Sequence, residues 1–220
     1  ILHKSQLFKS PNFNAEEAAM IEPLSTALHA ANRISINEDN KILILGAGGI
    51  GALLCAVCKT IANEVVVFDQ LEYRLKHVEK FFNSSDSLNY NDKNMLFEVR
   101  KGYLNNDFDI IFDCITTNES FEISHFLLKS SGKIVIVGIP EVDYLKLNPH
   151  KIRIKEIDLF NVRRSGISFK KCIDFQNEHN LSLNKLITHN FSLNNIQEAF
   201  TLNDSYSENI FRAAINMHNK

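Results

Sequence analysis

The chain has 220 residues, of which 45% are hydrophobic and 23% are charged, and its formal net charge is −2. This composition is that of an ordinary globular protein with enough apolar residues for a real core. The near-zero charge gives no electrostatic reason to expect nucleic acid or an anionic membrane as a partner. No signal peptide is visible, so the expected compartment is the cytoplasm.

The N-terminal part is expected to contain a short strand and a helix. Residues 1–11 read as the strand and a turn. Asn14, with Glu17 three residues later, makes a capping-box start for the helix. Pro23 is expected to interrupt this helix, which then continues over residues 24–33.

Unbroken runs of Val and Ile follow, separated by segments with helical spacing. Unbroken apolar runs are typical of strands that are covered by helices on both faces, so the pattern predicts an α/β fold with a doubly wound parallel sheet. The expected elements are strand 41–46, helix 49–62, strand 64–69, helix 70–82, a short strand near Leu88, helix 93–102, strand 107–114, helix 120–129, strand 133–140 and strand 156–163. The tail is expected to form helix 167–178, strand 185–191, helix 194–203 and strand 209–217.

The first of these strands runs into a glycine motif. Gly46, Gly48 and Gly51 have the spacing G-x-G-x-x-G, and Asp69 closes the next strand about 20 residues on. The first glycine allows a tight turn, the second lets a pyrophosphate approach the helix N-terminus, and the third lets the helix pack closely on the sheet. The carboxylate of Asp69 can accept hydrogen bonds from ribose hydroxyls. Strand, glycines, helix, strand and acid in this order predict a dinucleotide-binding site.

A membrane span is the competing interpretation of the same segment, because residues 42–58 carry no charge. The run is shorter than the ~20 apolar residues that a spanning helix needs. Its four glycines would also weaken such a helix. We therefore reject a membrane span.

Taken together, these segments resemble the zinc-type medium-chain dehydrogenases, and among them the sorbitol/polyol and threonine dehydrogenases. In the family's order, the resemblance is carried by EEAAMIEPLSTALHA (16–30), GAGGIG (46–51), FDQLEYRL (68–75), DCITTN (113–118), VGIP (137–140), EIDLFNVRR (156–164) and LITHNFSLNNIQEAF (186–200). It implies a Rossmann fold flanked by remnants of a GroES-like catalytic domain. The implied divisions are the end of that domain and a hinge helix (1–35), the NAD-binding domain (36–165) and a C-terminal segment that packs back toward the catalytic domain (166–220).

The part of the family pattern that binds zinc is missing. Family members carry an N-terminal domain with a Cys, a His-Glu pair and often a four-Cys lobe, whereas this chain has no His-Glu dipeptide and its four cysteines lack the lobe spacing. Cys55 and Cys58 fall inside the helix after the glycines, so they are expected to be buried rather than metal ligands. Because the chain also opens on Ile1 rather than Met, it is expected to be a fragment or a processed product.

The resemblance therefore implies the nucleotide-binding half of an NAD-dependent alcohol or polyol dehydrogenase. Zinc is expected only in the intact enzyme, and this half is expected to be inactive alone. Two catalytic residues are implied: Glu22, near the zinc-bound water or the substrate, and Arg164, as a contact to a polyol. The residues implied to bind the cofactor are Gly46, Gly48, Gly49, Ile50, Gly51, Asp69, Arg74, Thr116, Val137, Gly138, Ile139, Val162 and Arg163.

The residues that follow the strand ending at Asp69 favour NAD over NADP. Gln70 and Leu71 follow Asp69, so no basic residue stands there to receive a 2′-phosphate. Arg74 leaves this point open, because it can reach a phosphate or simply be an exposed helical arginine. The Arg163–Arg164 pair can likewise be a solvated basic turn.

The partners implied are a small alcohol or polyol and further copies of the chain. A homodimer or homotetramer would form through the edge strand of the Rossmann sheet, near residues 156–163. A stand-alone NAD-binding sensor or interaction domain remains an alternative. An ATP-using adenylating enzyme also has a GAGGIG loop, but residues 68–75 lack the second Asp and the Asn that it requires.

Overall fold

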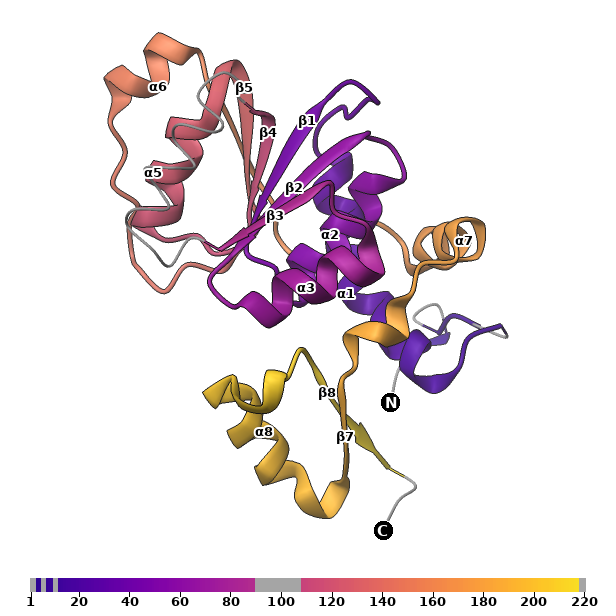
Figure 1. The fold of residues 1–220 in the computed structure, drawn as a ribbon. Coiled ribbons are helices and arrows are strands. Elements are labelled where there is room, and N and C mark those ends of the chain that lie inside the picture. Colours follow the sequence, from indigo (N-terminus) through magenta and orange to yellow (C-terminus); the bar gives the residue numbers. More distant parts are fainter. Residues whose placement is uncertain (1–2, 5–6, 10–11, 90–107, 218–220) are drawn as a thin grey trace.

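The computed structural model describes residues 3–4, 7–9, 12–89 and 108–217 (Figure 1). Its centre is a six-stranded sheet in the order β3-β2-β1-β4-β5-β6, with every neighbouring pair parallel. The strands are β1 (Lys41–Leu45), β2 (Glu64–Asp69), β3 (Asp86–Asn89), β4 (Phe108–Asp113), β5 (Leu128–Ile136) and β6 (Asp158–Asn161). This strand order is that of the doubly wound Rossmann fold, so the expected fold class is confirmed.

Helices cover both faces of the sheet (Figure 1). One face carries α1 (Ala15–Asn32), α2 (Gly49–Lys59) and α3 (Glu72–Phe82), and the other carries α5 (Asn118–Leu127) and α6 (Pro149–Lys155). Ile42 and Ile44 of β1 belong to the first apolar cluster, whereas Leu43 and Leu45 belong to the second. Because alternate side chains point to opposite faces, a strand buried on both sides needs the unbroken apolar run seen in the sequence.

Helix α1 does not break at Pro23, so the expected interruption is wrong. The helix runs through the proline, which is itself buried, and packs along α2. The helix start is as expected: the side chains of Asn14 and Glu17 form the capping box, with Glu17 N–H donating to Asn14 Oδ1 at 2.9 Å. Burial of one face of α1, including Met20 and Leu24, offsets the hydrogen bond that proline cannot donate.

Helix α6 was not expected from the sequence. The side chain of Asn148 accepts from the N–H groups of His150 and Lys151 at 3.0 and 3.1 Å, and Pro149 occupies the first helical turn. These are the usual signs of a helix start. The neighbouring strands differ from expectation as well: β5 starts at Leu128 and ends at Ile136, and β6 covers only four residues.

The tail lies outside the six-stranded sheet. After α7 (Phe169–His179), strands β7 (His189–Ser192) and β8 (Ala213–Asn216) form a separate parallel pair. The chain passes from one to the other through α8 (Ile196–Ser205) (Figure 1). Short 3₁₀ turns η2 (Leu183–Leu186), η3 (Leu193–Asn195) and η4 (Ser207–Asn209) stand where parts of the expected strands and helix were placed. The described residues among 1–11 form no strand, and the helix expected at 93–102 lies outside the described residues.

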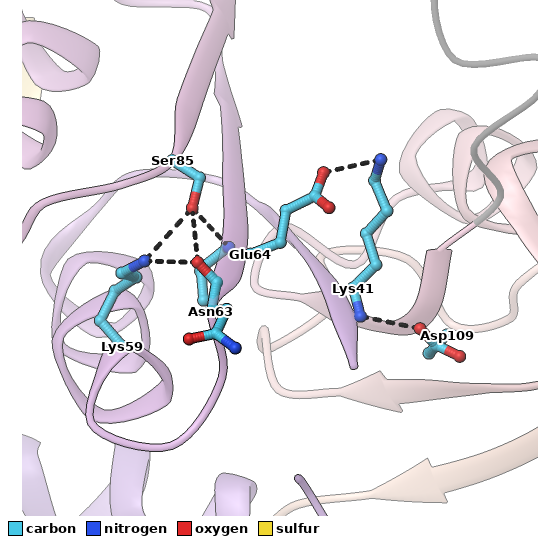
Figure 2. A network of polar contacts seen from close by, with 7 residues as sticks. Lys41, Lys59, Asn63, Glu64, Ser85 and Asp109 are labelled. Carbon is cyan, nitrogen blue, oxygen red and sulfur yellow. Dashed lines mark hydrogen bonds and ion pairs between the residues drawn. The ribbon is translucent and has the colours of Figure 1, made fainter. Parts of the chain in front are cut away.

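Polar side chains tie together the amino ends of neighbouring strands (Figure 2). The residues labelled there are Lys41, Lys59, Asn63, Glu64, Ser85 and Asp109. Lys41 pairs with Glu64 at 2.6 Å, and its backbone N–H donates to the Asp109 carboxylate at 2.7 Å. The hydroxyl of Ser85 donates to Asn63 O at 3.2 Å and accepts from Lys59 Nζ at 3.3 Å. These contacts join the amino ends of the strands, whereas ligands of such sheets bind at the opposite, carboxyl ends.

No helix within the described ranges has both the length and the apolar character that crossing a bilayer requires.

Asp113, at the carboxyl end of β4, is a fully buried acid. Its carboxylate accepts from the N–H groups of Ile115 and Thr116 at 3.0 and 2.8 Å and from the hydroxyl of Ser120 at 2.8 Å. Burial nevertheless raises the pKa of Asp113 above its ordinary value, because these hydrogen bonds only partly replace water. The acid thus fixes the loop between β4 and α5 at a cost that depends on pH.

Replacing Asp113 with Asn is expected to reduce the pH dependence of stability. A raised pKa in the folded state means that wild-type stability falls as pH rises through that pKa, whereas Asn keeps an acceptor oxygen and carries no charge. The free energy of unfolding of Asp113→Asn, measured with urea, should therefore equal that of the wild type near pH 4 and exceed it at higher pH. Asp113→Ala should lose about 1–3 kcal/mol near pH 4, because it leaves buried N–H groups unpaired, and less at higher pH, where the wild type is itself weakened. An Asn variant that weakens progressively toward pH 8 would contradict this account.

Candidate nucleotide-binding site

A cleft of about 490 Å³ opens at the carboxyl edge of the sheet, above β1, β2 and β4. Its floor is the loop from Gly46 to Gly51, and one wall is formed by residues 69–71 with Arg74. Residues Cys114 and Ile115 after β4 form another side. Two residues of the tail, Tyr206 and Arg212, complete the lining. The cleft thus lies where ligands of doubly wound sheets bind.

The glycine loop has the backbone that its sequence demands. Gly46 has φ +93°, a conformation that glycine adopts without strain, and its N–H donates to Phe68 O at 2.7 Å. A Cβ on Gly51 would overlap the carbonyl oxygen of Gly46. Gly48 is the N-cap of α2 and has no side chain to cap it, so the first N–H groups of the helix are left for a ligand.

Asp69 joins this loop to the end of β2. Its Oδ2 accepts from the N–H of Ala47 at 2.6 Å, and its Oδ1 accepts from the N–H of Leu71 at 2.8 Å. The side chain is 8% exposed and lines the cleft. A carboxylate offers about four lone-pair positions, so two N–H bonds leave acceptors for a ribose diol. Asp69 therefore braces the glycine loop in addition to facing the cleft.

Arg74, one turn into α3, lies beside this acid. Its Nη1 is 3.9 Å from Asp69 Oδ2, and its guanidinium lies over the ring of Tyr206, 4.9 Å from the ring centre. The side chain is 16% exposed, and its buried Nε has no hydrogen-bond partner among the described residues. The guanidinium is thus enclosed by the cleft rather than solvated on the helix surface.

Arg212 was not expected at the site, yet it lies on the glycine loop. Its guanidinium occupies the space that a Cβ on Gly49 would take, at the N-terminus of α2. Burial lowers the pKa of Arg212, and the negative charge of Glu22 opposes that shift. The residue directly precedes β8 and has no motif around it, so only the folded topology reveals it. A positive charge here complements an anion at the helix N-terminus.

The loops after β4 and β5 meet beside the cleft. Thr116 is buried with φ +61°, and its hydroxyl donates to Gly138 O at 3.1 Å. The N–H groups of Val137 and Gly138 donate to Asp113 O at 2.9 and 3.0 Å. A Cβ on Gly138 would approach the Thr116 hydroxyl to 2.6 Å, so the two loops touch. Ile139 follows and is 91% exposed.

The remaining expected site residues lie around this centre. Ile50 stands at the start of α2 and lines the cleft. Val162 follows β6, where its N–H donates to Ile136 O at 3.0 Å, and Arg163 is exposed next to it. Glu22 is an exposed residue of α1, and its negative charge interacts with the guanidinium of Arg212. Arg164 is exposed with φ +53°, and it is not among the described residues that line the cleft.

The described part of the chain does not offer a zinc site. No three His, Cys, Asp or Glu side chains within it gather as metal ligands. All four cysteines are free thiols, and burial raises the pKa of Cys55 to about 12 and raises that of Cys58 as well. Zinc binds the thiolate form, which these surroundings disfavour.

The strand order, the glycine loop and the cleft define a Rossmann-type nucleotide-binding protein. A finer assignment follows from the sequence: residues 49–178 match the family described as zinc-binding dehydrogenase, and the chain belongs to that family.

Relatives agree with this assignment. The chain is 28% identical over 210 residues to L-idonate 5-dehydrogenase from Vitis vinifera, covering 91% of this chain and 57% of the relative. It is 30% identical over 199 residues to sorbitol dehydrogenase from Homo sapiens, covering 88% and 55%. The chain thus spans little more than half the length of these relatives.

A solved structure shares the fold. An alcohol dehydrogenase from E. coli CFT073, complexed with NADH, matches with a TM-score of 0.87 and 21% identity, over 96% of this chain and 62% of that one.

Gly51→Ala is expected to destabilise the protein by about 1–3 kcal/mol, because the added methyl group overlaps a backbone carbonyl that cannot move freely. This effect is opposite to that of Gly→Ala in an ordinary helix interior, which stabilises the protein by about 1 kcal/mol. Gly48→Ala is the matched control, since its Cβ would meet only Arg74 Nη1 at 3.8 Å. Thermal and urea unfolding compare the two, and equal stabilities would contradict the overlap.

Proposed function

We propose that this chain is the nucleotide-binding part of a zinc-dependent alcohol or polyol dehydrogenase. It binds NAD, and the whole enzyme transfers a hydride between a secondary alcohol and that cofactor. The observation that carries the proposal is the glycine loop braced by Asp69 at the carboxyl edge of the sheet. The names of the relatives, L-idonate and sorbitol dehydrogenase, support a polyol as the substrate class.

NAD fits the residues of the cleft. The free N–H groups at the start of α2 and the guanidinium of Arg212 receive the pyrophosphate, with Gly48 leaving room for it. Asp69 accepts from the adenosine ribose, and Arg74 lies at the same end. Gly46, Gly49, Ile50 and Gly51 shape the floor of the cleft. When bound, NAD accepts the hydride from the alcohol carbon.

The nicotinamide end is assigned to the loops that meet beside the cleft. Thr116, Val137, Gly138 and Ile139 would lie under the ring, with Val162 and Arg163 from the loop after β6 near them. Glu22 and Arg164 are proposed as the residues that act on the substrate. Glu22 can hydrogen-bond a substrate hydroxyl or relay its proton, and Arg164 can donate to polyol hydroxyls.

Zinc does not fit the donors of the described residues. NAD is preferred over NADP because the carboxylate of Asp69 repels a 2′-phosphate and also balances the charge of Arg74 at 3.9 Å.

An adenylating enzyme and a stand-alone sensor are less favoured, since the relatives that match most of this chain are dehydrogenases.

We also propose a cytoplasmic location and assembly into a homodimer or homotetramer. The free thiols of all four cysteines suit a reducing compartment. Strand β6 is the last strand of the sheet, and an unpaired edge invites pairing with a second copy.

Gly48→Ala should weaken NADH binding at least ten-fold, because the new methyl group stands where the pyrophosphate approaches the backbone, and should lower stability less than Gly51→Ala does, through the poorer N-cap alone. Asp69→Ala should weaken binding and also lower the melting temperature, since Ala47 and Leu71 N–H both lose their acceptor. Titration followed by the emission of NADH measures both. The chain has no Trp, so the signal belongs to the cofactor. Wild-type affinity in both variants would remove the glycine loop from the site.

Leu159→Lys should shift the protein from dimer to monomer, because a lysine on an edge strand opposes pairing with another chain. Leu159, in β6, is 38% exposed. Leu193→Lys is the control, since Leu193 is 47% exposed but lies in η3, away from the sheet edge. Light scattering after size-exclusion chromatography gives the mass of each. A monomeric wild type would contradict the proposed assembly.

A further inference from the structure

The tail of the chain is seated along α3, next to the nucleotide cleft. Tyr73 donates its hydroxyl to Ile210 O at 2.8 Å, and the ring of His77 lies 4.7 Å from the ring of Phe211. Ile210 and Phe211 are 1% and 5% exposed. The backbone N–H of Phe211 also donates to the hydroxyl of Thr188 at 2.9 Å. These contacts fix the position of the residues on either side, which are the ones that line the cleft.

Tyr206 is held there in an unfavourable backbone conformation. It is the C-cap of α8, with φ +51° in the left-handed region. The C-caps of α3, α6 and α7 have the same conformation. Those of α3 and α7 are Asn83 and Asn180, a residue type that tolerates it, whereas that of α6 is Glu156. A bulky aromatic residue at positive φ is strained, and the surrounding contacts must offset that strain. The fold therefore keeps a ring at a point where the backbone would prefer asparagine or glycine.

The ring of Tyr206 faces the guanidinium of Arg74. The guanidinium carbon is 4.9 Å from the ring centre, and Arg74 Nη1 is 3.9 Å from Asp69 Oδ2. The buried Nε of Arg74 has no hydrogen-bond partner in the described part of the chain. The ion pair and three aromatic rings therefore orient the side chain, and the ring of Tyr206 is the nearest of the three, since those of Tyr73 and Phe211 are each 6.0 Å from the guanidinium. Tyr206 is itself 54% exposed and lines the cleft, which leaves part of it open to a ligand.

We propose that Tyr206 is a positioning residue for the nucleotide: its ring holds the Arg74 guanidinium beside Asp69, at the ribose end of the cleft. The inference rests on the proposed function, since the ligand it serves is NAD. An arginine side chain has several rotatable bonds, and restricting it before the ligand arrives lowers the entropy lost on binding. A tail residue thereby prepares a charge that the Rossmann core carries on α3.

The test is a titration of NADH against variants of Tyr206 and Arg74. Tyr206→Asn removes the ring while relieving the backbone, so it should melt no lower than the wild type and bind NADH about three- to ten-fold more weakly. Tyr206→Phe keeps the ring and should bind within two-fold of the wild type. In an Arg74→Ala background, Tyr206→Asn should cause no further loss. Tyr144→Ala, at a tyrosine that is 74% exposed and does not line the cleft, is the matched control and should bind like the wild type.

Three results would overturn the inference while leaving the proposed function intact. These are wild-type affinity in Tyr206→Asn, a Tyr206→Phe variant as weak as Tyr206→Asn, or an equal loss from Tyr206→Asn with and without Arg74. A wild-type chain that binds no NADH at all would instead overturn both this inference and the proposed function.

Discussion

The carboxylate of Asp69 accepts hydrogen bonds from two backbone N–H groups, one in the loop after β1 and one in the loop after β2. Ala47 belongs to the turn after β1, and Leu71 belongs to the start of α3. With the acid in place, the glycine turn is held against the end of β2, and the first turn of α2 lines the cleft. The residues that surround this point, including Arg74 and Arg212, complete a cleft whose floor the acid has already set. An unpaired buried N–H costs about 1–3 kcal/mol, so the brace is a substantial part of the local stability.

Much of this arrangement could be predicted because it depends on local pattern. Gly46, Gly48 and Gly51 are required by a turn, a close approach and a helix contact, and each requirement is visible in the spacing alone. The unbroken apolar strands specified a sheet covered on both sides. The Asn14 capping box likewise depends only on residues three apart. Helix α6 was missed, although Asn148 and Pro149 give the usual signal for a helix start.

What could not be predicted depends on contacts between distant segments. Pro23 would break an isolated helix, but packing of α1 on α2 holds it in place. Arg212 and Tyr206 have no motif around them, and they reach the cleft only because the tail is seated on α3. The second role of Asp69, as a brace, depends on an N–H that lies 22 positions away. Such residues can be found only after the chain has been folded.

The long separation between Asp69 and Arg212 has a consequence for synthesis on the ribosome. The two residues are 143 positions apart (212 − 69), although they line one cleft. At about 5–20 residues per second, the second follows the first by roughly 7–29 s. A nascent chain can therefore pair its central strands well before the guanidinium of Arg212 emerges. During that interval the cleft lacks the positive charge that lies on the glycine loop in the complete chain.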